Sequence, residues 1–492
     1  MQALKRLFCF PVAQACLLAV LTVLTVRGRF DDPDLWWHLK MGQVIYSTHS
    51  IPAHDLFSYT TNHQALVPQE WLAELSLYCA YLAGGYSGIM AWFCVFAVLL
   101  VVSGYALCWL YSGNVKVAFG GGALVWFFAT IGFTIRPQLV AYCLLIAELI
   151  LIELGRRRDA RWFYALPAVF LVWINCHGSF VLGIVVGCAL LACSFAEFEA
   201  GSLIARRWEP QRQRALAWAL AASVAILLVN PAGVKQILYP FDTLMNMPLL
   251  MTYVQEWAPL KMTEARGIGL MAVLFCCCLL AITRKADLRL DELMLLGLGT
   301  WLAVSHNRML IVFGILAAPI LTRQLAGLWE NYEFAKDRVL PNAIVIGGAV
   351  VAIILAFPSA ANLEAQVEEQ SPVHAVEYIQ SHHLAGPMLN DYPSGGYLIW
   401  AAPEYPVMMD GRTDIYEWSG FLAEYGNWAL GATDPNLLLD KYKVNFCLLS
   451  PHSQMVVTLS LLHTWKQVYA DDHAVIFVRE SGNRDQGIGN SF

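Results

Sequence analysis

Long apolar runs recur along this chain and restrict what it can fold into. They lie near residues 8–26, 87–111, 117–134, 138–154, 162–174, 179–197, 216–229, 267–283, 290–304, 309–322 and 342–358. A helix of about 20 apolar residues crosses the core of a bilayer. Only 14% of the residues are charged and 58% are hydrophobic, whereas soluble domains carry about 25% charged residues. The chain is therefore predicted to be a polytopic α-helical membrane protein with about 11 transmembrane helices.

The connections between these runs differ in charge. One alternating set holds seventeen Lys and Arg, including Lys5, Arg6 and the stretches "GRRRDAR" and "ARRWEPQRQR", and the other set holds eight. Cytoplasmic loops carry the excess of basic residues. We therefore expect a cytoplasmic N-terminus, a first helix that is retained because no cleavage site follows it, and a tail outside. This topology requires residues 68–84 to stay at the membrane interface.

Unusual polar motifs collect on the outer side of this topology. They are "DDPDLWWH", "PQEW", "RPQ", "NCHG", "NPAG", "QEW" and "HNR". Polar side chains at membrane depth are costly and usually mark a functional pathway. The sequence therefore predicts a functional site on the outer face.

The first of these motifs supplies the candidate catalytic carboxylate. Asp34 and His38 are four positions apart, so they share a face if Asp32 caps a helix that Pro33 begins. Asp34 is then placed to take a proton from an acceptor hydroxyl, and Asp32 is the alternative base. If the site uses a divalent cation, Asp34 and His38 are its expected ligands. The competing interpretation is that these acids only favour the start of the helix.

Positive and proton-donating groups stand in other outer connections. Arg136 and Gln138 belong to "RPQ", His177 to "NCHG", and His306 and Arg308 to "HNR". An arginine fork binds phosphate bidentately, although a single arginine also snorkels to lipid headgroups. His177 alone is more often structural.

The pairs Glu70–Trp71 and Glu256–Trp257 repeat the tripeptide "QEW" in two outer loops. Each pair either binds a sugar, with the carboxylate on hydroxyls and the indole on a ring face, or anchors its loop at the interface.

The composition changes after residue 359, which divides a transmembrane domain (1–359) from a predicted extracytoplasmic domain (360–492). "GPMLND", "YPVMMDGR", "VNFCLLS" and "HAVIFVRE" are expected to be strands of a small α/β domain, with a helix around 454–465. Asp391, Asp410, Arg412 and Asp414 would then lie at strand ends, where they either contact an acceptor or stabilise turns.

Together these motifs resemble the GT-C superfamily of integral-membrane glycosyltransferases, which includes protein O-mannosyltransferases, the lipid A aminoarabinose transferase and oligosaccharyltransferase catalytic subunits. The resemblance rests on "DLWWHLKMGQVIYSTHSIPAHDLFSYT", "QEWL", "RPQ", "INCHGSF", "NPAG", "NDYPSGGYLIW" and "DGRTDIY", in this order. It is most similar to an uncharacterised bacterial branch with a C-terminal soluble domain. Many members carry adjacent acids in the first loop, whereas here Asp31–Asp32 and Asp34 compete.

The resemblance implies a GT-C-like fold with interfacial helices in the first outer loop, in a bacterial inner membrane with the tail in the periplasm. It implies transfer of a sugar from a polyprenyl-phosphate or diphosphate carrier to a glycan, lipid or protein acceptor, with inversion. Asp34 matches the family's first-loop aspartate. No cofactor is certain, and a divalent cation is possible. The phosphate role falls by chemistry to Arg136, Arg308 or His306.

Two other functions remain open. A flippase or transporter of lipid-linked sugars predicts polar residues deep inside the spans. Such residues are scarce here, and the main examples are Glu148 and Glu153, toward the inner half of one segment. A glycan polymerase or ligase shares the chemistry and differs in the donor. Nucleic acid is not an expected partner, because the formal net charge is −6.

Overall fold

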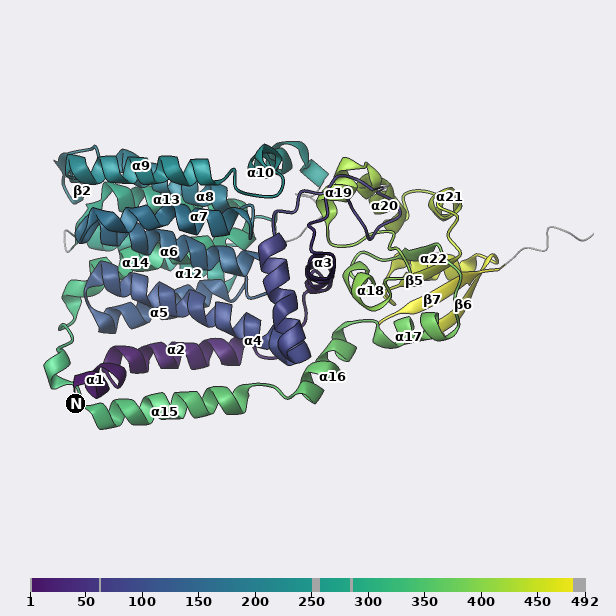
Figure 1. Cartoon of the computed structure of the whole chain (residues 1–492), viewed down its shortest axis with the longest axis horizontal. Helices are drawn as coiled ribbons and strands as arrows, with labels where there is room; N and C mark the ends of the chain where they lie inside the picture. The colour runs from purple at the N-terminus through teal and green to yellow at the C-terminus, as the bar shows by residue number, and fades with distance from the viewer. Residues whose placement is uncertain (1, 62, 250–256, 284–285, 481–492) are drawn as a thin grey trace, which may run out of the picture. The chain divides into compact units, whose positions relative to one another are not determined.

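The structure, a computed structural model, describes residues 2–61, 63–249, 257–283 and 286–480 (Figure 1). The chain divides into two compact units. Unit 1 comprises Met1–Arg29 and Val67–Ala360, and unit 2 comprises Phe30–Leu66 and Ala361–Phe492. The first loop, which was predicted to belong to the transmembrane domain, therefore packs with the tail.

Unit 1 is almost entirely helical. Its helices are α1 (Gln2–Leu7), α2 (Phe10–Val26), α4 (Trp71–Ser112), α5 (Val115–Ala129), α6 (Gln138–Arg157), η1 (Ala160–Ala165), α7 (Leu166–Ile174), α8 (Phe180–Cys193), α9 (Pro210–Ile226), α10 (Val234–Asn246), α12 (Ala265–Ile282), α13 (Leu290–Ser305), η3 (Asn307–Met309), α14 (Leu310–Leu325), η4 (Ala326–Leu328), η5 (Phe334–Lys336) and α15 (Val339–Ala356). Each predicted apolar run overlaps at least one of these helices, and the run 162–174 spans both η1 and α7. Strands β1 (Phe198–Ala200), β2 (Leu203–Ala205) and β3 (Leu288–Arg289) form a small sheet in that order.

Several of these helices have the length and apolarity of membrane spans. Within the described residues there are five, namely Trp71–Ser112, Gln138–Arg157, Ala265–Ile282, Asn307–Leu328 and Val339–Ala356, and shorter apolar helices accompany them. The protein is thus a multi-pass membrane protein. The number of about 11 crossings and their orientation stay predictions.

The core of unit 1 lies around α14. All its residues from Leu310 to Ile320 are buried, as expected for a helix that is apolar on every side. Phe313 of α14 meets Phe128 of α5 edge to face, with ring centroids 5.3 Å apart. By contrast, α15 leaves Leu340 and Leu355 72% and 80% exposed, which suits a helix that faces lipid.

Helix α4 contains a break that divides it into two parts. The backbone leaves helical geometry at Gly84 and at Gly85, whose φ is 58°. This left-handed conformation favours glycine, because it has no Cβ. Figure 1 shows the two parts of α4 running in different directions. The break falls where the predicted interfacial segment 68–84 ends. That this segment stays at the interface remains a prediction.

Side-chain contacts define two opposite ends of unit 1. At one end Arg156 of α6 pairs with Glu153 (2.6 Å) and with Asp291 of α13 (2.9 Å), and Arg323 of α14 pairs with Glu292. We call this the arginine end. The N-terminus of α6, at Gln138, marks the other end, which we call the Glu70 end because α4 begins there. The 20 residues of α6 span about 30 Å between the two.

Unit 2 is a mixed α/β unit. Its elements are α3 (Leu35–Thr48), most of α16 (Ala360–Gln370), α17 (Val373–Ser381), β4 (Met388–Asn390), α18 (Gly395–Ala401), α19 (Thr413–Trp418), α20 (Phe421–Ala429), α21 (Pro435–Lys441), β5 (Phe446–Leu449), α22 (Gln454–Leu461), β6 (Trp465–Ala470) and β7 (Val475–Arg479). The sheet has the order β4-β5-β7-β6, in which β4 and β5 are parallel and the other neighbours antiparallel.

One strand prediction for the tail was wrong, and one strand was missed. Strand β6 was not predicted, and "YPVMMDGR" is not a strand of the sheet. The reason is that its backbone is used elsewhere: Val407 bridges to Ser58 of the first loop, and the Met408 N–H donates to the Asn390 side chain at 2.8 Å. The Tyr59 hydroxyl also donates to the Met388 carbonyl at 2.8 Å. These contacts hold the first loop within unit 2.

Candidate functional site

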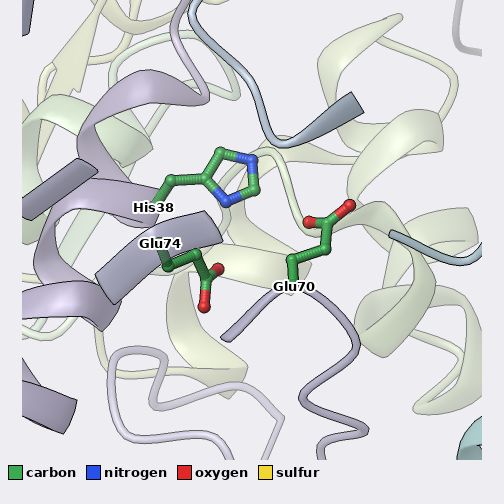
Figure 2. Close-up of side chains that lie close together, drawn as sticks. All are labelled: His38, Glu70 and Glu74. Carbon is green, nitrogen blue, oxygen red and sulfur yellow. The ribbon is translucent and has the colours of Figure 1, made fainter. Parts of the chain in front are cut away.

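Two glutamates stand at the start of α4, at the Glu70 end of unit 1 (Figure 2). Glu70 occupies the N-cap position and Glu74 lies one turn further on, where it is buried. Oxygen atoms of their two carboxylates lie within 4.8 Å of each other. Like charges this close repel each other, and a cation or a shared proton relieves the repulsion. The E-x-x-x-E spacing is present in the sequence, but Glu74 was not predicted as a site residue.

The turn between α7 and α8 is fastened to this helix start. The Trp71 indole N–H donates to Asn175 Oδ1 at 2.7 Å, and the Leu72 N–H donates to the Asn175 carbonyl at 3.1 Å. Trp71, predicted to bind sugar, thus has a structural hydrogen bond. The turn places His177 Nε2 at 3.5 Å from Glu70 Oε1. A Cβ atom on Gly178 would lie 2.5 Å from Gln69 Oε1, so this glycine makes room for the Gln69 side chain.

The protonation of His177 follows from its surroundings. The Ser179 N–H donates to Nδ1 at 3.1 Å, so Nδ1 is the acceptor and the proton of the neutral ring is on Nε2, facing Glu70. Burial and the positive charge of Arg308 lower the pKa of His177 to about 3. The imidazole is therefore neutral at pH 7 and offers a polarised N–H rather than a charge.

Arg308 is the fixed cation of the same end. Its guanidinium donates to Gln138 Oε1 at 2.6 Å and lies 4.8 Å from the centroid of the Trp257 ring. His306 meets the same indole edge to face at 5.1 Å, and burial and Arg308 lower its pKa. Four predicted residues, Gln138, Trp257, His306 and Arg308, are thus joined in one contact network, and Arg308 acts electrostatically on His177 as well.

This arrangement combines three chemical abilities. The two carboxylates accept protons or bind a cation, the neutral imidazole donates a hydrogen bond, and the guanidinium balances negative charge. The indole face beneath Arg308 holds the cation in place without neutralising it. Such a set is suited to a reaction that releases an anionic leaving group.

The pH dependence of stability tests the state of His177. Its folded pKa of about 3 lies below the ordinary value of 6.5, so folding favours the neutral ring. This contribution is complete above pH 6.5 and is lost as the pH falls from 6.5 towards 3. We expect His177→Asn to flatten the fall of the melting temperature between pH 6.5 and 4.5. The exposed His463→Asn control should keep the wild-type slope; an unchanged slope in His177→Asn would contradict the assignment.

The acidic motif of the first loop lies in unit 2, at the start of α3. The helix begins at Leu35 with Asp34 as N-cap residue, so the expectation that Asp32 caps a helix begun by Pro33 was wrong. The cause is local: Asp32 Oδ1 accepts the Asp34 N–H at 3.0 Å, which holds Pro33 in a turn before the helix. Asp32 is 4% exposed, whereas Asp34 is half-buried.

The carboxylate of Asp34 is positioned by two neighbours. Its Oδ1 accepts the Trp37 indole N–H at 3.2 Å, and a Cβ atom on Gly411 would lie 1.7 Å from the same oxygen. Likewise, a Cβ on Gly396 would lie 2.2 Å from the Pro33 carbonyl oxygen. The glycines of "SGGY" and "DGR" in the tail therefore make room for the acidic motif.

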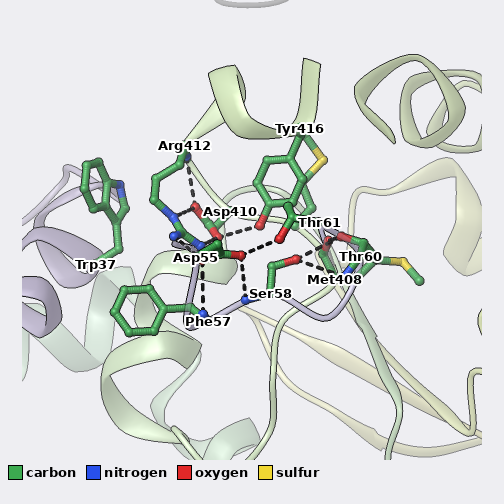
Figure 3. A network of polar contacts seen from close by, with 12 residues as sticks. Trp37, Asp55, Phe57, Ser58, Thr60, Thr61, Met408, Asp410, Arg412 and Tyr416 are labelled. Atoms are coloured by element: carbon green, nitrogen blue, oxygen red, sulfur yellow. Dashed lines mark hydrogen bonds and ion pairs between the residues drawn. The ribbon is translucent and has the colours of Figure 1, made fainter. Parts of the chain in front are cut away.

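A buried ionic network fixes the first loop further (Figure 3). Arg412 bonds to Asp55 (2.5 Å) and Asp410 (2.6 Å), and the Tyr416 hydroxyl donates to Asp410 at 2.6 Å. Burial acts to raise the pKa of Asp55, but Arg412 and the Thr61 hydroxyl overcome it and lower the pKa. Asp410 and Arg412 are thus structural, and Asp391 accepts the Ser450 N–H at 2.7 Å in a turn.

Arg136, His38 and Glu256 are the remaining predicted site residues. Arg136 is half-buried in the turn before α6. His38 is buried on α3 of unit 2, with its ring centroid 3.6 Å from that of Trp37. Glu256 lies outside the described residues. Within the described part of unit 2, no three His, Cys, Asp or Glu side chains gather as metal ligands; a cation on Asp34 and His38 stays a prediction.

Comparison with known structures gives this architecture a context. ArnT from Cupriavidus metallidurans, in the apo state, is similar over 96% of this chain and 97% of its own, with a TM-score of 0.54 and 14% identity. The Archaeoglobus fulgidus oligosaccharyltransferase, also apo, is similar over 88% and 69%, with a TM-score of 0.53 and 13% identity. The chain has the fold of the GT-C glycosyltransferases. At this identity the likeness concerns the fold alone. No sequence-family model and no curated protein match the chain.

Proposed function

We propose that this protein is a membrane glycosyltransferase that moves a sugar from a polyprenyl-phosphate or diphosphate carrier to an acceptor. The observation that carries the proposal is the network of Glu70, His177, Gln138 and Arg308 at one end of an apolar helical bundle with the GT-C fold. The apolar helices can accommodate the polyprenyl chain of a lipid-linked substrate, and the guanidinium of Arg308 can bind the phosphate of the carrier.

The leaving group determines the role of Arg308. As the bond between the anomeric carbon and the phosphate oxygen breaks, its electron pair leaves with the phosphate and negative charge develops there. Arg308 is held by Gln138 and Trp257, so it balances this charge without reorganising. Similar proteins support a polyprenyl carrier: one ArnT structure contains undecaprenyl phosphate, and one archaeal oligosaccharyltransferase structure contains dolichol-phosphate and an inhibitory peptide.

We assign the general base to Asp34. It takes the proton of the acceptor hydroxyl while the acceptor oxygen forms its bond to the anomeric carbon, with inversion. Asp34 is favoured over Asp32 because Asp32 is buried and its Oδ1 already accepts the Asp34 N–H. The Trp37 indole N–H orients the Asp34 carboxylate.

A divalent cation, if the reaction uses one, fits Glu70 and Glu74. Their oxygen atoms lie within 4.8 Å, and paired carboxylates suit hard cations. The cation would supply positive charge near the carrier's phosphate. The chain's own residues then act around it: the neutral His177 ring lies beside the Glu70 carboxylate, with Nε2 3.5 Å from Oε1, and Trp71 with Asn175 fixes the helix start.

A transfer assay tests this function. Purified protein in vesicles is given labelled sugars on polyprenyl phosphate and on polyprenyl diphosphate, with release of the carrier as readout. We expect release with wild type and at least a tenfold loss with Arg308→Gln, because a charged hydrogen bond is removed. Arg266→Gln is the matched control, since the Arg266 guanidinium also donates to a neutral side chain, the Thr130 hydroxyl just after α5, at 3.1 Å. Equilibration of the donor between leaflets without any release would favour a flippase and overturn the proposal.

A further inference from the structure

The arginine end of unit 1 contains a pocket that the proposed transfer reaction does not use. It lies where the end of α6, strand β2, the start of α9 and the start of α13 meet, and its volume is about 480 Å³. Six arginines line it: Arg156, Arg157, Arg206, Arg207, Arg212 and Arg289. The pocket is separated from Gln138 by the length of α6, about 30 Å for 20 residues.

The arginines of the pocket outnumber its acids. Glu209 and Asp291 are the acidic residues of the lining. Glu209 accepts from Arg212 at 3.1 Å, and Asp291 accepts from Arg156 at 2.9 Å. Walls of low polarity around a concave site of one charge strengthen its field. The pocket therefore attracts anions.

Two of the arginines remain available to a ligand. Arg206 and Arg207 are exposed, and within the described residues neither side chain makes an ion pair or a hydrogen bond. Most of the other cations of the pocket are engaged: Arg289, for example, pairs with Glu292 at 3.0 Å. Hence Arg206 and Arg207 can bind a ligand, whereas arginines such as Arg289 are already held by ion pairs.

The segment that carries the free arginines is held in place by its neighbour Trp208. The Trp208 N–H donates to the Ser194 carbonyl at 2.9 Å, and its ring stacks on Phe163 at 6.5 Å with the planes 8° apart. The Arg156 guanidinium lies over the same ring at 5.7 Å. Pro210 then starts α9. This anchoring orders the backbone of Arg206 and Arg207 before any ligand binds, which lowers the entropic cost of binding.

We propose that this pocket binds a phosphate-bearing anion, at a site distinct from the Glu70 end. Planar guanidinium groups bind phosphate through paired hydrogen bonds, and several of them around one cavity select for a multiply charged phosphate. The volume is in the range of small-molecule sites, about 300–1,000 Å³. The anion is either the headgroup of a phospholipid or a soluble phosphate ester, because both present the same oxygens.

Thermal melting of the purified full-length protein tests the proposal and separates the two sources. One arm adds pyrophosphate, and the other reconstitutes the protein in nanodiscs with phosphatidic acid in place of phosphatidylcholine. A rise in melting temperature in the first arm identifies a soluble phosphate, and a rise in the second arm alone identifies a lipid headgroup. Either rise supports the proposal if it disappears in the pocket variant.

The pocket variant is Arg206→Gln/Arg207→Gln, and the matched control is Arg158→Gln/Arg214→Gln. The control removes the same charge from exposed residues that do not line the pocket. We expect the apparent affinity to weaken about tenfold or more in the pocket variant and to change little in the control. Equal weakening in both variants, or no rise with either probe in wild type, would overturn the proposal. The sugar-transfer assay is not used, so failure of the proposed function leaves this test intact.

Discussion

Replacement of Asp34 by asparagine is expected to slow sugar transfer by at least about 100-fold, since a positioned general base contributes about 10²–10⁴. The change keeps the shape of the side chain. In the wild-type protein Asp34 Oδ1 accepts the Trp37 indole N–H at 3.2 Å, and the amide oxygen of asparagine can accept the same bond. The melting temperature should therefore stay close to that of wild type. Carrier release by purified protein measures the effect.

Two neighbouring acids make this experiment specific. Asp31→Asn removes an exposed carboxylate from the same loop and should leave transfer nearly unchanged. Asp32→Asn alters a buried residue whose oxygen accepts the Asp34 N–H. If Asp34→Asn retains full activity while Asp32→Asn loses it, the base is Asp32 and our assignment is wrong.

Replacement of Arg412 by methionine is expected to destabilise unit 2 by about 3–5 kcal/mol, the usual effect of removing one partner from a buried ion pair. Arg412 joins Asp55 and Asp410, and all three side chains are at most 2% exposed. Methionine fills a similar volume but leaves two buried carboxylates without their counter-charge. Unfolding monitored by limited proteolysis of the tail measures the loss.

An exposed pair provides the matched control. Lys441 contacts Glu424 at 2.7 Å, with the lysine side chain 56% exposed. Lys441→Met also removes one cation from unit 2, yet exposed pairs contribute at most about 1 kcal/mol. Similar stability losses in the two variants would show that the Arg412 network is not the main tie between the first loop and the tail.

The helical architecture was readable from the sequence because apolar runs report burial in lipid directly. The positions of α2, α5, α6 and α15 follow from hydropathy alone. The positive-inside rule required residues 68–84 to stay at the membrane interface. The break at Gly84–Gly85 lies at the end of this segment. The membership of residues 30–66 in unit 2 was not readable, because it depends on contacts over more than 300 residues, such as Asp55 with Arg412.

The types of residue in the candidate site were predictable from the sequence, but which residues contact one another was less predictable. Gln138, His177, His306 and Arg308 were selected because each is a costly polar residue in an outer connection, and the structure joins them through Trp257 and through charge. Glu74 was missed because it lies inside a helix that was treated as an anchor. Asn175 was overlooked as the partner of Trp71 because a hydrogen bond between distant residues has no sequence spacing.

The discontinuous composition of unit 2 has a consequence for biosynthesis. Asp55 leaves the ribosome early, but its counter-ion Arg412 is translated only after every helix of unit 1. Nascent chains must therefore carry an unfinished loop throughout membrane insertion. A premature stop codon ahead of Arg412 leaves that loop permanently incomplete and exposed to quality-control proteases. In the same way, a tail expressed alone lacks the carboxylate that its arginine requires.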